Sequence, residues 1–132
     1  MFSHISYNNK KLTSKGDSKL NSDNFKVNLS LRDTLSKLDF GIVKESVTGE
    51  KIDYHIITGN EDNGAILLVY EKYFQRVGNR ITLTIVLDNI NGPTKVHSIG
   101  GGAAQGMFFK FDWGASESFT SLPREILSKY II

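Results

Sequence analysis

Three side chains near the middle of the sequence have the types and spacing that could hold a divalent metal ion. Asp53 and His55 are alternate residues of one predicted strand, and Glu71 lies on the next strand. Alternate residues on a strand are about 6.5 to 7 Å apart and neighbouring strands about 4.8 Å apart, so the three groups could converge on one ion. The predicted pairing adds Thr84 and His97 to the same row. The simpler interpretation, which we favour, is a set of solvated polar side chains on one sheet face. No cofactor is expected.

A run of small residues, Gly-Gly-Gly-Ala-Ala-Gln-Gly at 100–106, could cradle a phosphate group. A dinucleotide-binding loop needs G-x-G-x-x-G before a helix, and a P-loop needs Gly-Lys followed by Ser or Thr. The run has neither spacing, and the apolar stretch after it is typical of a strand. We therefore interpret the glycines as serving backbone geometry, with a neighbouring helix or Gln105 filling the space above them. A valine at Gly101 should then destabilise the fold through a clash.

The second predicted hairpin brings basic and aromatic side chains together. Lys72, Arg76 and Arg80 could contact nucleic acid there. Glu71 lies among them and basic strand ends are commonly only solvated, so no nucleic-acid partner is expected. Glu71 and Arg80 are instead predicted to form a surface ion pair worth about 0 to 1 kcal/mol. The candidates for contact with a ligand or a partner are Glu71, Tyr73, Arg80, Gln105 and Lys110.

Hydrophobic periodicity defines the elements that must position these residues. After a short strand at 25–29, Ser30 is a predicted helix N-cap, and apolar residues at helical spacing extend the helix to about Glu45. Gly41 inside this helix indicates either a bend or a close packing contact. The periodicity then changes to two residues, and short turns connect the strands as antiparallel hairpins. The predicted strands of this part are 51–58, 65–76, 79–88, 94–99 and 107–113.

Pairing the strands so that apolar residues stay together defines a core face. The predicted register sets Tyr70 opposite Ile85 on one side and beside Tyr54 on the other. The core face collects Ile52, Tyr54, Ile56, Leu68, Tyr70, Phe74, Ile81, Leu83, Ile85 and Leu87. The opposite face carries a second apolar set, Ile57, Leu67, Val69, Tyr73 and Val86. Such a patch is generally covered by another element, paired with a second copy, or used to bind a ligand.

A second helical pattern near the end of the sequence has four apolar residues on one face, Phe119, Leu122, Ile126 and Tyr130. Either this helix kinks at Pro123, or a new helix begins with Ser121 as cap and the proline in its first turn. The predicted fold is an α+β two-layer sandwich. An antiparallel β-meander of four to six strands carries an N-terminal and a C-terminal helix on one face. Residues 1–24 are predicted to be a flexible polar arm, and 25–132 a single domain.

The composition excludes several functional classes. The 132 residues include no cysteine, which excludes disulfides, thiol nucleophiles and cysteine-ligated metal sites. A formal net charge of +2 gives the chain little field with which to attract nucleic acid or an anionic membrane. No window approaches the roughly 20 apolar residues of a membrane span, and the first residues lack the apolar stretch of a signal peptide. We expect a cytoplasmic protein with no membrane partner.

Three segments form a set of motifs. They are Tyr70-Glu71-Lys72-Tyr73, Gly78-Asn79-Arg80-Ile81-Thr82-Leu83 and the glycine run with the Met-Phe-Phe-Lys that follows it. In order and spacing they resemble the motifs of a family of short bacterial proteins, domain of unknown function 6054. The resemblance covers roughly 25–127 and departs from the family at Ala103, where the family pattern has serine. It implies an α+β domain without an assigned activity or catalytic residue.

These observations favour a non-enzymatic binding or protein-interaction module. We expect it to associate with itself through the outer sheet face, the face opposite the core face. The alternative is a small enzyme or ligand carrier that uses Asp53, His55 and Glu71, or a cleft beside the glycine run. The expected partner is a second copy of the chain, or else an unidentified protein or small-molecule ligand. No residue is assigned a catalytic role, because no nucleophile lies in a known catalytic motif.

Overall fold

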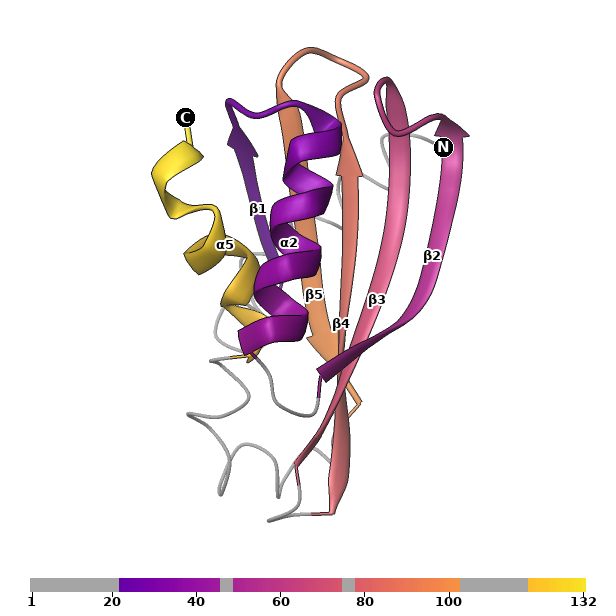
Figure 1. The fold of residues 1–132 in the computed structure, drawn as a ribbon, viewed down its shortest axis with the longest axis vertical. Coiled ribbons are helices and arrows are strands. Elements are labelled where there is room, and N and C mark those ends of the chain that lie inside the picture. Colours follow the sequence, from indigo (N-terminus) through magenta and orange to yellow (C-terminus); the bar gives the residue numbers. More distant parts are fainter. Residues whose placement is uncertain (1–21, 46–48, 75–77, 103–118) are drawn as a thin grey trace, which may run out of the picture.

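The computed structural model describes residues 22–45, 49–74, 78–102 and 119–132 as an antiparallel sheet with helices on one side (Figure 1). The strands are β1 (Ser22–Val27), β2 (Gly49–Gly59), β3 (Gly64–Phe74), β4 (Asn79–Asp88) and β5 (Thr94–Gly101). The helices are α2 (Leu31–Glu45) and α5 (Leu122–Ile126), and a 3-10 turn, η2 (Ser128–Tyr130), follows α5. The predicted α+β two-layer arrangement is confirmed. The strand predicted at 107–113 lies outside the described residues.

The described strands are ordered β1-β5-β4-β3-β2 in the sheet. β2 to β5 form the predicted meander, and β1 pairs antiparallel with β5 at the far edge. β1 begins at Ser22 and not at residue 25, so the end of the predicted polar arm belongs to the sheet. Its polar first residues pair with β5 through the backbone, which requires no apolar side chains. Apolar periodicity therefore missed them.

Helix α2 begins and ends where the sequence predicts. The Ser30 hydroxyl accepts a hydrogen bond from the Asp33 backbone N–H at 3.0 Å, which is the N-cap contact. A side chain at Gly41 would begin 2.5 Å from Cδ1 of Ile126. Glycine therefore lets α5 pack closely against α2. Of the two explanations left open for Gly41, the close packing contact is confirmed.

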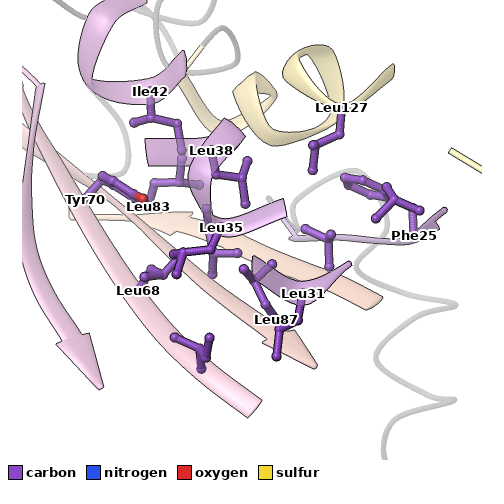
Figure 2. Packing of buried hydrophobic residues seen from close by; sticks show 14 of the residues in the cluster. Phe25, Leu31, Leu35, Leu38, Ile42, Leu68, Tyr70, Leu83, Leu87 and Leu127 are labelled. Carbon is purple, nitrogen blue, oxygen red and sulfur yellow. The ribbon is translucent and has the colours of Figure 1, made fainter. Parts of the chain in front are cut away.

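The hydrophobic core lies between α2 and the helix-facing side of the sheet, as Figure 2 shows. The core residues from α2 are Leu31, Leu35, Leu38 and Ile42. The core residues from β3, β4 and β5 are Ile66, Leu68, Tyr70, Ile81, Leu83, Ile85, Leu87 and Val96. Of this sheet set, all but Ile66 and Val96 were predicted. The side chain of Phe74, also predicted in the core, lies outside the described part of the chain.

Three residues of β2 that were predicted in the core are instead exposed. The exposed fraction is 48% for Ile52 and 37% for both Tyr54 and Ile56. β2 is an edge strand, and Figure 1 shows it to one side of α2. The period of two predicts the face to which a side chain points, but it does not predict how far the helix layer extends.

Both hairpin registers are shifted by two residues from the prediction. Tyr70 pairs with Leu83 and not with Ile85, and Tyr54 pairs with Leu68 and not with Tyr70. Because the side-chain period of a strand is two, this shift keeps the side chains of β3, β4 and residues 53–56 on their predicted faces. The irregularity between Lys51 and Asp53 is an exception, because it places Lys51 opposite the buried Tyr70 on the helix side, where the alternation predicted Ile52. The shift does change which side chains are cross-strand neighbours.

Of the two explanations offered for Pro123, the new helix is the correct one, although Ser121 at its N-cap position makes no side-chain capping hydrogen bond. The proline lies in the first turn of α5, which begins at Leu122, so a new helix starts there. After η2 the chain returns to the free edge of β1. The Asn28 N–H donates to the carbonyl of Tyr130, and the Ile132 N–H donates to the carbonyl of Lys26. The last residues thereby pair with the edge of β1.

Candidate functional site

Three predicted candidates, Glu71, Tyr73 and Arg80, come together on the face of the sheet opposite the helices, which we call the outer face. The Arg80 guanidinium donates from Nη1 to Oε1 of Glu71 at 3.0 Å. Its central carbon lies 5.4 Å from the centre of the Tyr73 ring. One guanidinium thus combines an ion pair with a cation–π contact. The other candidates, Gln105 and Lys110, lie outside the described residues.

The strand register explains the geometry of this cluster. Arg80 is directly opposite Tyr73, whereas Glu71 is opposite Thr82. The Arg80 side chain therefore reaches diagonally to Glu71, which confirms the predicted ion pair between offset positions. The side chain of Arg80 is 61% exposed and that of Glu71 is 20% exposed. The cluster thus presents an oriented cation beside an aromatic ring, an arrangement suited to recognition of a partner.

The described part of the glycine run, residues 100–102, lies at the same end of the sheet. The Thr82 hydroxyl donates to the Gly101 carbonyl at 3.3 Å. At Gly102, where φ is +103°, a side chain would begin 2.8 Å from the carbonyl oxygen of Arg80. A side chain at Gly100 would overlap Cγ2 of Thr120, in the helical turn before α5. A helical segment therefore fills the space above Gly100, and a carbonyl oxygen beside Gly102 would repel a phosphate.

Gly101 is not a position at which the described residues require glycine. It is absent from the glycines with positive φ, and among the described residues the nearest atom to a Cβ there would be Oγ1 of Thr82 at 3.8 Å. The described residues therefore show no clash with a Cβ at Gly101, and the clash predicted for valine at this position stays a prediction. The prediction treated the run as uniform, but alternate strand residues face opposite sides of the sheet. The steric requirement lies at Gly100 and Gly102.

The three candidate metal ligands, Asp53, His55 and Glu71, are not brought together. Asp53 pairs with Val69, and Glu71 pairs with Glu50, so the two carboxylates belong to different cross-strand rows. His55 is exposed on the edge strand. Within residues 22–45, 49–74, 78–102 and 119–132, no three His, Asp or Glu side chains are grouped to hold a metal ion. The predicted row is wrong because both hairpins are shifted and the pairing of β2 is irregular between residues 51 and 53.

A cluster of polar side chains on the helix side of the sheet was not predicted from the sequence. The buried Tyr70 hydroxyl donates to Oδ1 of Asp39 on α2, and Nζ of Lys51 on β2 lies 3.0 Å from the same carboxylate. Burial, together with the bond to Asp39, raises the pKa of Tyr70 far above its ordinary range. Tyr70 therefore joins the sheet to α2. It serves the fold, while Glu71 and Tyr73 of the same motif face outward.

A further cluster of polar side chains links the first turn of α2 to the turn between β2 and β3. Nε of Arg32 donates to Asp62 at 2.8 Å, and its Nη1 donates to Glu61 at 3.0 Å. The Tyr54 hydroxyl also donates to Glu61. The hydrogen bond from Arg32 lowers the pKa of Asp62. Its residues lie far apart in the sequence and have no characteristic spacing, so no sequence pattern predicts their contacts.

Replacing Glu71 by alanine should lower the free energy of unfolding by at most about 1 kcal/mol, because the ion pair with Arg80 lies at the surface. Chemical denaturation of the two proteins measures this difference. Arg80→Ala is the matched variant and should cost slightly more, because it also removes the contact with Tyr73. A Glu71→Ala protein that failed to fold would contradict the surface position of the pair.

Comparisons with known proteins agree with the motifs. No helix in the part of the chain that the structure describes is long and apolar enough to cross a membrane. The chain matches none of the curated proteins with which it was compared. A protein-family model described as a family of unknown function, DUF6054, matches residues 21–131. This range includes every described helix and strand. The chain therefore belongs to the family of unknown function DUF6054.

Proposed function

We propose that this protein is a non-enzymatic protein-interaction module that binds a second copy of itself through the outer face. The proposal rests on the apolar centre of that face. Leu67 and Val69 of β3 lie there with Val86 of β4 and Ile99 of β5. These side chains are only partly buried, and Ile99 is 43% exposed. Helices α2 and α5 do not cover them, because both pack on the other side of the sheet (Figure 1). A contiguous apolar surface of this kind favours association.

The residues next to the apolar centre suit a protein interface. Tyr73 is 38% exposed, and the Arg80 guanidinium lies over its ring. Tyrosine and arginine are enriched among the residues that contribute most to binding at interfaces. The ion pair with Glu71 restricts the Arg80 side chain, so less conformational entropy is lost when a partner binds.

The charges on the outer face favour a symmetric dimer. Along β2 this face carries Glu50 and Asp53, whereas the opposite edge carries Lys26 of β1 and Lys95 of β5. Asp88, the cross-strand neighbour of Lys95, reduces this positive charge without cancelling it. Along the strands, Asp53 lies four residues and Glu50 six residues from the cross-strand row of Lys26 and Lys95. The acidic and basic groups therefore occupy diagonally opposite corners of the face. A two-fold axis inclined at about 45° to the strands lays the acidic corner of one copy over the basic corner of the other, with the two sheets packed orthogonally. That orientation pairs the two corners twice.

Size-exclusion chromatography with light scattering tests the proposal. The full chain should elute as a dimer and Val69→Glu as a monomer, because a charge at the centre of the interface would be buried without a partner. Val43→Glu adds the same charge to an exposed position of α2 and should remain dimeric. Thermal melting of both variants verifies that they fold. A wild type that stays monomeric at high concentration would refute self-association.

The same chromatography tests the orientation of the dimer. Lys26→Glu and Asp53→Lys should each weaken the dimer, because each places like charges at the paired corners. The double variant should recover the wild-type dimer, because its charge pattern is again complementary. If neither single change shifts the monomer–dimer equilibrium, the orientation is wrong, and Val69→Glu alone then decides whether the outer face is the interface.

A further inference from the structure

A groove of about 540 Å³ lies between α2 and the C-terminal helical segment, on the side of the sheet away from the outer face. We propose that this helix groove binds an amphipathic organic anion, in which a carboxylate, sulfonate or phosphate is attached to an apolar ring or chain. The residues that line the groove include Lys37, Phe40, Lys44, Ile126, Lys129 and Tyr130. The proposal does not depend on self-association, because it uses the opposite layer of the fold.

The apolar floor of the groove follows from the glycine in α2. A side chain at Gly41 would begin 2.5 Å from Cδ1 of Ile126, so Ile126 lies directly against the α2 backbone. Phe40 lines the groove from α2 and is 67% exposed, and the partly buried ring of Tyr130 lines it from η2. Exposed aromatic surface gains free energy when another apolar group packs on it. The floor and these two rings therefore fit the apolar part of a ligand.

Lysines around the groove define the sign of the ligand charge. Nζ of Lys37 lies 5.1 Å from the centre of the Tyr130 ring, and Nζ of Lys44 lies 5.5 Å from the centre of the Phe40 ring. These cation–π contacts hold two ammonium groups next to the apolar walls. Lys129 lines the same groove. The acidic residue of the lining, Glu125, accepts a hydrogen bond from the Ser121 hydroxyl at 3.0 Å. The groove therefore carries a net positive charge.

Size and polarity together favour a small molecule over a protein segment. Sites for small molecules typically have volumes of about 300 to 1,000 Å³ and combine apolar walls with a few charged or polar groups. A simple anion would leave the exposed Phe40 ring in water. An uncharged apolar molecule would gain nothing from the three lysines. Only a ligand with both parts uses the whole groove.

The experiment follows backbone amide chemical shifts of the full chain during titration with 2-naphthoate. Saturable shifts should be confined to residues 36–44 and 125–130. The uncharged isostere 2-naphthamide should bind at least tenfold more weakly, because it lacks the carboxylate that pairs with the ammonium groups. Equal binding of the two compounds, shifts centred outside the groove, or no saturable naphthoate binding would each overturn the proposal.

Neutralised variants test the role of the lysines. Lys37→Gln combined with Lys129→Gln should weaken naphthoate binding at least tenfold and leave naphthamide binding unchanged. The control, Lys26→Gln combined with Lys95→Gln, removes the same charge from the outer face, so it should weaken the dimer but change neither affinity in the helix groove. All four positions are at the surface or partly exposed, and thermal melting verifies that both double variants fold. Wild-type naphthoate affinity in the groove variant would contradict the proposal.

Discussion

A Gly102→Ala variant is expected to lose about 1 to 3 kcal/mol of unfolding free energy, whereas Gly101→Ala next to it should lose none. Gly102 has φ +103°, a conformation that L side chains rarely adopt, and a Cβ there would begin 2.8 Å from the Arg80 carbonyl oxygen. That oxygen belongs to the backbone of β4, so it cannot move aside cheaply. At Gly101 the nearest atom to a Cβ, among the residues that the structure describes, is 3.8 Å away. Alanine fits there and also reduces the entropy of the unfolded chain.

Urea denaturation of the wild type and both variants measures this contrast. Equal stability of the Gly101→Ala and Gly102→Ala proteins would show that the glycine run is not required by backbone geometry. Thermal melts with a nucleotide panel test the phosphate-cradle alternative. A ligand that binds the native state raises its melting temperature, so a nucleotide-dependent shift in the wild type would reinstate that alternative.

The helix boundaries and the two faces of the sheet could be predicted because they depend on local chemistry. Ser30 as N-cap needs only its own hydroxyl and the N–H of Asp33, which lies three residues away. The face to which Leu68 or Leu83 points needs only the period of two along its own strand. Both signals survive a shift in strand register, and so both predictions are confirmed.

The cross-strand neighbours could not be predicted as well, because they depend on how each hairpin closes. A register two residues from the true one satisfies the same apolar pattern, so apolar matching alone could not choose between Ile85 and Leu83 as the partner of Tyr70. The predicted row from Asp53 to Glu71 depended on that choice and was wrong. The contact between Glu71 and Arg80 was predicted correctly because a long side chain tolerates a diagonal offset.

The width of the helix layer also has no signal in the sequence. Ile56 has the same alternation as residues of the central strands, yet it is 37% exposed because β2 is an edge strand. The bond between Tyr70 and Asp39 likewise depends on where α2 crosses the sheet. Its two residues lie 31 positions apart, and no spacing rule connects a helix residue to a strand residue at that distance.

Loss of the hydrogen bond between Tyr70 and Asp39 is the second change that we expect to have a large effect on stability. Asp39→Ala should lower the free energy of unfolding by about 1 to 3 kcal/mol, because the buried Tyr70 hydroxyl loses its acceptor. Lys51→Ala removes the other partner of the same carboxylate, but that ion pair is about one-third exposed and should contribute at most about 1 kcal/mol. If Lys51→Ala is as destabilising as Asp39→Ala in urea denaturation, the bond to Tyr70 is not the main contribution.

Tyr70→Phe provides a second measurement, because it removes the hydroxyl itself. If the hydroxyl and the carboxylate act as a pair, Asp39→Ala should cost less in the Tyr70→Phe background than in the wild type. In the double variant no buried hydroxyl is left without a partner. Strictly additive costs of the two changes would contradict a direct contact.

The same tyrosine predicts how stability changes at alkaline pH. The pKa of Tyr70 is raised in the folded protein by burial and by the bond to Asp39, whereas in the unfolded chain it is about 10. Above pH 10 the unfolded state therefore releases a proton that the folded state keeps. The stabilising contribution is complete below pH 10 and is lost as pH rises, at up to about 1.4 kcal/mol per pH unit.

Tyr70→Phe removes this titration, so its unfolding free energy should fall less steeply above pH 10 than that of the wild type. The difference between the two slopes should approach that of one proton, about 1.4 kcal/mol per pH unit. Tyr54 also has a raised pKa, because it donates to Glu61, but its titration is common to both proteins and cancels in the comparison. Urea denaturation at pH 8, 10 and 11 measures the two slopes. Parallel curves would mean that Tyr70 ionises as readily in the folded chain as in the unfolded one. That result would contradict a buried hydroxyl held by the Asp39 carboxylate.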